Sequence, residues 1–135
     1  RLVGLSTLSM AVVSGGEVFG MKMLPRSRGA DVLLHAPIQL QYQLPDGAIR
    51  FAVGAEIDAN DHSASIWTDF NLVLSVDGKE VSRHHLTQDQ RQIDINIECR
   101  GAVLTLGLES AGNGPIMDRL RLRDPVVLLT EKDAR

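Results

Sequence analysis

The sequence predicts an all-β fold, an antiparallel β-sandwich of the jelly-roll kind, and three observations carry this prediction. Apolar and polar residues alternate in several short segments, most clearly along Ile38–Leu44 and Phe70–Val76. Turn signals such as Asp77-Gly78 separate these segments at hairpin spacing. No stretch shows the 3.6-residue period of an amphipathic helix. Short alternating strands joined by tight turns are typical of sandwiches and jelly rolls.

Composition places the chain among ordinary globular proteins. It has 135 residues, of which 44% are hydrophobic, and a formal net charge of -3. This length suffices for one domain with its own core, so we expect residues 1–135 to form a single module. Basic residues are scattered, which argues against nucleic-acid binding, and no apolar run reaches the length of a membrane span. The chain begins without a methionine and ends in a polar tail, so we expect it to come from a longer multidomain protein.

The first half of the chain is expected to contain four strands. Segments 1–13 and 17–24 mix apolar with small polar residues, and Pro25 ends the second of them. Residues 26–29 are expected to be an exposed loop, and a short apolar piece follows at 32–34. Segment 38–44 is the clearest strand, because every second residue is apolar and the residues between them are glutamines. Segment 51–57 has the same alternation, with its apolar residues on one face.

The second half continues the pattern. Phe70–Val76 is a strand with one apolar face, and Asp77-Gly78 supplies the positive φ that a tight hairpin needs. Residues 80–86 then return as a polar strand. Two more half-buried strands are expected at 93–97 and 104–108, and an arginine-rich last strand at 118–129. The polar segment 59–65 is a loop, the kind of element on which binding residues concentrate.

Signs of catalysis are missing from the sequence. It contains no Gly-x-Ser-x-Gly motif, no HExxH motif and no phosphate-binding loop. Cys99 is the only cysteine, and its place at the end of an alternating strand predicts a core residue rather than a nucleophile. His84 and His85 are adjacent on a strand and therefore point to opposite faces, which argues against joint metal binding. We therefore expect a protein that is not an enzyme.

Three arginines, Arg119, Arg121 and Arg123, alternate along the last strand and so share one face of it. Two interpretations are open. The three cations can bind an anionic sugar or partner, or they can solvate an edge strand and discourage aggregation.

Several motifs follow one another in an order that is characteristic of a known family. They are Leu33-Leu34-His35-Ala36-Pro37, the segment 51–58, the turn Val76-Asp77-Gly78-Lys79, Leu104-Thr105-Leu106, and Asp118 followed by Asp124-Pro125. Over about residues 33–129 their order and spacing resemble the NPCBM family of carbohydrate-binding modules. Members often carry a tryptophan after the last aspartate, where this chain has Leu122. The resemblance implies a galactose-binding-like β-sandwich that binds glycans of the galactose or N-acetylgalactosamine type. It also implies an extracellular, periplasmic or cell-surface location and covalently attached neighbouring domains.

Four residues are candidate glycan contacts. Trp67 precedes the Phe70 strand and offers a large apolar face on which a sugar ring can stack, although a residue at a strand entrance also serves as a core edge. His35 matches the histidine of the family and either contacts a ligand or orients its loop by hydrogen bonds. Asp61 and Asp118 are the other two candidates, and Asp118 can equally cap a turn.

Three further residues, Asp58, Asn60 and Asp124, are candidate ligands of a structural calcium ion. Carboxylates that converge from two loops supply the oxygen ligands that calcium prefers, and sandwiches of the resembled kind often carry such an ion. The segment 58–62 lacks the spacing of an EF-hand loop.

The leading hypothesis is a non-catalytic module that binds glycans. The alternative is a structural or protein-interaction sandwich of a larger extracytoplasmic protein that has lost sugar binding. The scarcity of aromatic residues, 4% of the chain, keeps this alternative open.

Overall fold

The computed structural model describes residues 1–58, 67–112 and 118–130. One group of strands consists of β1 (Leu2–Gly4), β5 (Arg26–Arg28), β6 (Asp31–His35), β8 (Ala48–Ile57), β11 (Gln92–Glu98) and β13 (Arg119–Leu129). A second group consists of β2 (Met10–Gly15), β7 (Ile38–Gln43), β9 (Asp69–Val76), β10 (Lys79–Thr87) and β12 (Val103–Ser110). Two short strands, β3 (Glu17–Val18) and β4 (Met21–Lys22), form a separate hairpin.

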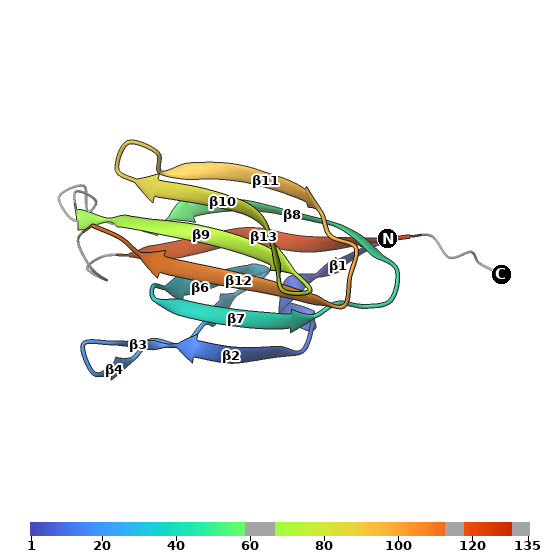
Figure 1. Ribbon diagram of the computed structural model, residues 1–135, viewed down its shortest axis with the longest axis horizontal. Coiled ribbons are helices and arrows are strands. Elements are labelled where there is room, and N and C mark those ends of the chain that lie inside the picture. The colour runs from blue at the N-terminus through green and yellow to red at the C-terminus, as the bar shows by residue number, and fades with distance from the viewer. Residues whose placement is uncertain (59–66, 113–117, 131–135) are drawn as a thin grey trace.

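These groups form two antiparallel sheets that face each other as a β-sandwich (Figure 1), which confirms the predicted fold. The first sheet has the order β11-β8-β13-β6-β5, with β1 also paired to β13, and the second has the order β10-β9-β12-β7-β2. The described residues contain no α-helix, and helical structure there has 3-10 geometry, in the turn η1 (Leu5–Thr7) and at Trp67. That part of the chain contains no helix long and apolar enough to cross a membrane.

The core lies between the two sheets and follows from the alternation in the sequence. The apolar residues of β7, β9 and β12 point inward, and Leu40, Leu72 and Leu104 are completely buried. Phe51, on β8, is buried against them from the other sheet. Cys99 is also buried, as predicted, and burial raises the pKa of its thiol to about 11. A thiol of this kind is inert at neutral pH.

The hairpin at Asp77-Gly78 forms where it was predicted. Asp77 and Gly78 have φ values of 51° and 84°, which is the left-handed geometry of a tight turn. Oδ1 of Asp77 accepts hydrogen bonds from the backbone N–H groups of Ala102 and Val103, at 3.0 and 2.9 Å. The turn therefore serves the scaffold and holds the chain that leads into β12.

Three segments differ from the sequence-based expectation. Segment 1–13 is split by η1 into β1 and β2, which join different sheets. Segment 17–24 is a hairpin rather than one strand, because Phe19 and Gly20 turn the chain with φ values of 51° and 79°. The expected loop at 26–29 contains β5, which pairs with β6 at the edge of the first sheet. An edge strand of this kind depends on its neighbour and leaves no periodic pattern of its own.

The sandwich has two distinct ends, as Figure 1 shows. At the turn end lie the Asp77-Gly78 turn and the first residue, Arg1, whose carbonyl oxygen accepts the N–H of Leu129 at 2.8 Å. At the opposite end, which we call the loop end, β6 and β8 finish, β9 and β13 begin, and the β3–β4 hairpin projects.

Candidate functional site

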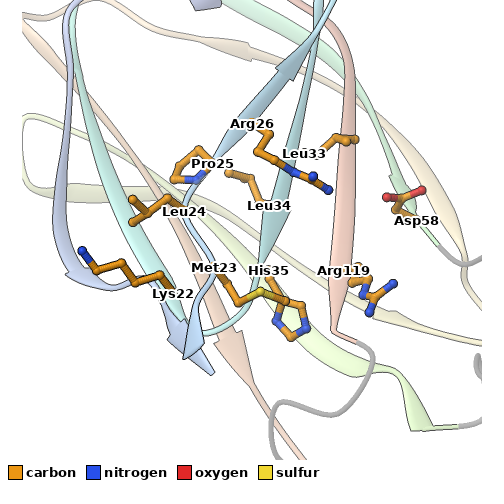
Figure 2. A pocket seen from close by; sticks show the side chains of 10 residues that line it. All are labelled: Lys22, Met23, Leu24, Pro25, Arg26, Leu33, Leu34, His35, Asp58 and Arg119. Carbon is orange, nitrogen blue, oxygen red and sulfur yellow. The ribbon is translucent and has the colours of Figure 1, made fainter. Parts of the chain in front are cut away.

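A pocket of about 430 Å³ opens at the loop end, on the outer face of the first sheet. Figure 2 shows that the segment 22–26, from the last residue of β4 to the first of β5, forms one side, while β6, β13 and the residue after β8 form the other. The lining residues are Lys22, Met23, Leu24, Pro25, Arg26, Leu33, Leu34, His35, Asp58 and Arg119. An apolar lining with a few charged groups is typical of ligand-binding pockets.

Three neighbouring strands bring the polar residues of this pocket together. Arg119 on β13 pairs with His35 on β6, and the N–H of Asp58 donates to the carbonyl oxygen of Arg119 at 2.9 Å. The residues beside them in sequence, Leu34 and Leu120, point into the core. Because side chains alternate along a strand, His35, Arg119 and Asp58 face outward. Two residues singled out from the sequence, His35 and Asp58, therefore line one pocket.

His35 both orients its loop and lines the pocket. The residue is 8% exposed, and Nδ1 lies 2.7 Å from the carbonyl oxygen of Ala36. A carbonyl oxygen can only accept, so Nδ1 carries the hydrogen and Nε2 of the neutral ring is an acceptor. Burial lowers the pKa of His35, and the positive charge of Arg119 acts in the same direction, whereas the Ala36 hydrogen bond opposes both. The ring is therefore neutral at physiological pH.

Two of the three alternating arginines on β13 are held by carboxylates of neighbouring strands. Arg121 forms an ion pair with Asp31 on β6 at 2.7 Å, and Arg123 forms one with Glu56 on β8 at 2.8 Å. Gly54 leaves room for this second pair, because a Cβ there would lie 2.7 Å from Nη2 of Arg123. β13 lies inside the first sheet, so the interpretation that the arginines solvate an edge strand is wrong.

The third arginine, Arg119, is different. Within residues 1–58, 67–112 and 118–130, neither Arg119 nor Asp58 forms an ion pair, although their backbones are hydrogen-bonded. Lys22 and Arg26, on the other side of the pocket, also have no ion-pair partner in this part of the chain. Charged groups that line a pocket without engaging each other are available to a ligand.

Two aromatic side chains are exposed, and both lie at the loop end. Trp67, a candidate from the sequence, is 48% exposed just before β9. Phe19, at the tip of the β3–β4 hairpin, is 75% exposed. The other aromatic residues, Tyr42, Phe51 and Phe70, are buried in the core. Sequence reasoning missed Phe19, because it read the hairpin tip as part of one strand.

Asp118, a predicted ligand contact, is completely buried and holds the backbone of the loop end instead. Its Oδ1 accepts the N–H of Asp69 at 3.0 Å, and its carbonyl oxygen accepts the N–H of Ala36 at 2.9 Å. Asp69 in turn accepts the N–H of Gly112 at 3.1 Å and is bonded to His85. Burial raises the pKa of Asp118 to about 6. Because Asp118 is buried, we assign it to holding the backbone of the loop end and not to direct glycan contact.

The predicted calcium ligands do not assemble into one site. Asp58 lies beside Arg119, whereas Asp124 follows Arg119 by five positions along β13, which is roughly 15 Å at the rise of a strand. Calcium binds oxygen atoms at about 2.3–2.6 Å, so these two aspartates cannot share an ion. Asn60 and Asp61 lie outside the described residues. Among the residues that the structure describes, no group of three or more His, Cys, Asp or Glu side chains is placed to hold a metal.

Sequence comparison gives no match, since no family model and no curated protein matches the chain. Solved structures do match. The second CBM51 module of ZmpB from Clostridium perfringens, solved with GlcNAc together with the INT domains, superposes with a TM-score of 0.72 at 17% identity. The match covers 97% of this chain and 32% of that one.

Two further structures from the same organism are similar. The CBM51 module of its GH95 protein, solved with methyl-galactose, gives a TM-score of 0.69 at 18% identity and is covered over its full length, with 95% of this chain. A structure of the M60 catalytic domain of ZmpB with two CBM51 modules gives 0.70 at 17% identity, covering 96% of this chain. The chain spans only 15% of that larger protein. These comparisons show that the chain has the β-sandwich fold of carbohydrate-binding modules.

Proposed function

We propose that the protein is a non-catalytic module that binds glycans in the loop-end pocket. The observation that carries this proposal is the group of Arg119, Asp58 and His35, which lie side by side in the pocket without ion pairs among the described residues. Arg119 offers hydrogen-bond donors, while the Asp58 carboxylate and the neutral ring of His35 offer acceptors. Sugar hydroxyl groups both donate and accept, so this mixture suits them.

The exposed aromatic residues and the comparisons support the same conclusion. An indole or phenyl face at the surface can stack on the apolar face of a sugar ring, and Trp67 and Phe19 are both exposed at the loop end. The similar structures carry GlcNAc and methyl-galactose. We therefore propose galactose- or N-acetylgalactosamine-type glycans as ligands, following the NPCBM-like motifs. We also propose an extracytoplasmic module attached to neighbouring domains.

Calorimetric titration of the purified protein with galactose, N-acetylgalactosamine and oligosaccharides that contain them tests this proposal. Asp58→Asn should weaken binding about five- to tenfold, because it removes a charged acceptor from the pocket. The matched control is Asp94→Asn, which removes the same charge from an exposed residue on β11. If none of these ligands binds, or if the two variants bind alike, the proposal is wrong.

A protein-interaction module is the second candidate, and one observation favours it. Phe19, Met21 and Leu24 are 75%, 62% and 51% exposed on and beside the β3–β4 hairpin. Exposed apolar residues gathered on one element are typical of interaction surfaces. A protein that binds none of the sugars above, but loses a protein partner on Phe19→Ala, would have this function instead.

A further inference from the structure

Resting on the proposed function, we infer that the glycan is anionic. The pocket is suited to a galactose-type ring that carries a carboxylate or a sulfate group. This specifies the ligand class more narrowly than the fold and the motifs do.

The described lining of the pocket carries more positive than negative charge. Among the described residues, three cations, Lys22, Arg26 and Arg119, line the pocket together with one carboxylate, that of Asp58. His35 is neutral there, because burial lowers its pKa. The whole chain carries a net charge of -3, so the positive pocket is a local feature that opposes the overall balance. A concave site lined by one sign of charge concentrates ligands of the opposite sign.

Among the described residues, Arg119 has no ion-pair partner, although it lies on a strand whose other two outward arginines are paired. Arg121 and Arg123 share its face, and each is engaged by a carboxylate of an adjacent strand at 2.7 and 2.8 Å. Asp58, just after β8, donates its backbone N–H to the carbonyl oxygen of Arg119, but the two side chains form no ion pair within the described residues. A guanidinium binds a carboxylate or sulfate through two parallel N–H groups. Arg119 is therefore the group that we assign to the ligand's acidic substituent.

The remaining pocket residues complete the recognition of an acidic sugar. Asp58 and Nε2 of His35 accept hydrogen bonds from ring hydroxyl groups, which a simple anion does not have. Met23, Leu24 and Pro25 supply apolar surface on the opposite side of the pocket, as Figure 2 shows. The pocket thus combines a cationic part with a part that suits a polyhydroxylated ring.

The test compares matched ligands by calorimetric titration of the protein. The probes are D-galactose, D-galacturonate, the methyl ester of D-galacturonate, galactose 6-sulfate and acetate. We expect galacturonate to bind about tenfold more tightly than galactose or the methyl ester, since the ester keeps the sugar ring and loses the negative charge. This preference should shrink as NaCl rises from about 20 to about 500 mM, in line with the shorter Debye length. Galactose 6-sulfate distinguishes a sulfated from a carboxylated glycan as the natural source.

Two variants locate the effect. Arg119→Gln should abolish the preference for galacturonate over its methyl ester. Arg123→Gln removes the same charge from the same strand, outside the pocket, and should retain the preference. Thermal unfolding of both variants confirms that each is folded.

The possible outcomes separate the two proposals. If galactose binds as tightly as both galacturonate and galactose 6-sulfate, the inference is overturned and the glycan-binding function stands. If no sugar binds, the proposed function fails and the inference with it. A preference that survives Arg119→Gln, or acetate binding as tight as that of galacturonate, also overturns the inference. A preference that survives Arg119→Gln would mean that another residue binds the acidic group. Equally tight binding of acetate would mean that the sugar ring contributes nothing to the affinity.

Discussion

The two ends of the sandwich use their polar side chains in different ways. At the turn end, the carboxylate of Asp77 accepts hydrogen bonds from two backbone N–H groups and so stabilises the turn. At the loop end, a buried layer around Asp118 holds the backbone, and a second layer with Arg119 and Asp58 lies above it without ion pairs in the described residues. The comparison indicates how a β-sandwich can form a binding site. The buried layer around Asp118 stabilises the strand ends, so Arg119 and Asp58 above it are available to bind a ligand.

Among these predictions, Asp118→Asn in the buried layer should change the free energy of unfolding most. Burial raises the pKa of Asp118 to about 6, so the native state holds this proton more tightly than the unfolded chain does. The free energy of unfolding that this group contributes therefore falls as pH rises from about 4 to about 6, and it stays low above that range. The uncharged Asp118→Asn variant should be more stable than the wild type at about pH 7.5 by about 2–3 kcal/mol, since one pKa unit corresponds to about 1.4 kcal/mol. Urea denaturation across this pH range measures the difference.

The control for that experiment is Asp94→Asn, which changes an exposed aspartate of β11. Its stability relative to the wild type should not follow the same pH course. A constant difference between wild type and Asp118→Asn at all pH values would contradict the role of a buried, titrating carboxyl group.

At the turn end, Asp77→Ala should lower the free energy of unfolding by about 1–2 kcal/mol and leave glycan affinity unchanged. It leaves two backbone N–H groups without their acceptor and places alanine at a φ of 51°. Asp77→Asn is the matched control, because asparagine keeps an acceptor oxygen and tolerates this φ. Denaturant unfolding and a sugar titration on the same samples give both readouts. A change in affinity on Asp77→Ala would mean that the two ends are coupled.

The smallest effects should come from the exposed aromatic residues of the loop end. Trp67 and Phe19 do not line the pocket, so Trp67→Ala and Phe19→Ala should each weaken oligosaccharide binding about two- to fivefold and leave monosaccharide binding unchanged. Val81→Ala, an exposed apolar residue near the turn end, is the control and should have no effect. Equal oligosaccharide affinity in all three variants would show that the pocket alone contacts the glycan.

The strands that face the core on one side could be predicted from the sequence. Burial of one face forces alternation, so segments 38–44, 51–57 and 70–76 were recognised from that pattern. The β3–β4 hairpin and the edge strand β5 could not be predicted from the sequence. One depends on a positive φ at Phe19, which the sequence pattern does not mark, and the other on pairing with β6 in a sheet whose register the sequence does not show.

The candidate site could be predicted only in part. His35, predicted as a glycan contact, and Asp58, predicted as a calcium ligand, both line the pocket, and a ligand contact of either residue stays a prediction. Arg119 was recognised as one of three equivalent arginines. Which of them is available depends on the carboxylates of β6 and β8 that lie across the strands, and sheet register is not visible in one sequence. No sequence pattern marked the segment 22–26 as part of the site, because it lines the pocket only through its position over the first sheet.

The position of the chain's first and last described strands has a practical consequence for how the protein can be displayed. Arg1 and Leu129 are hydrogen-bonded to each other at the turn end, away from the pocket. A biotin tag or a fusion partner joined before Arg1 or after Leu129 would leave the pocket facing away from the attachment point, toward a glycan-coated surface. Modules immobilised in this way can all engage such a surface at once, so even a weak single contact would produce measurable avidity.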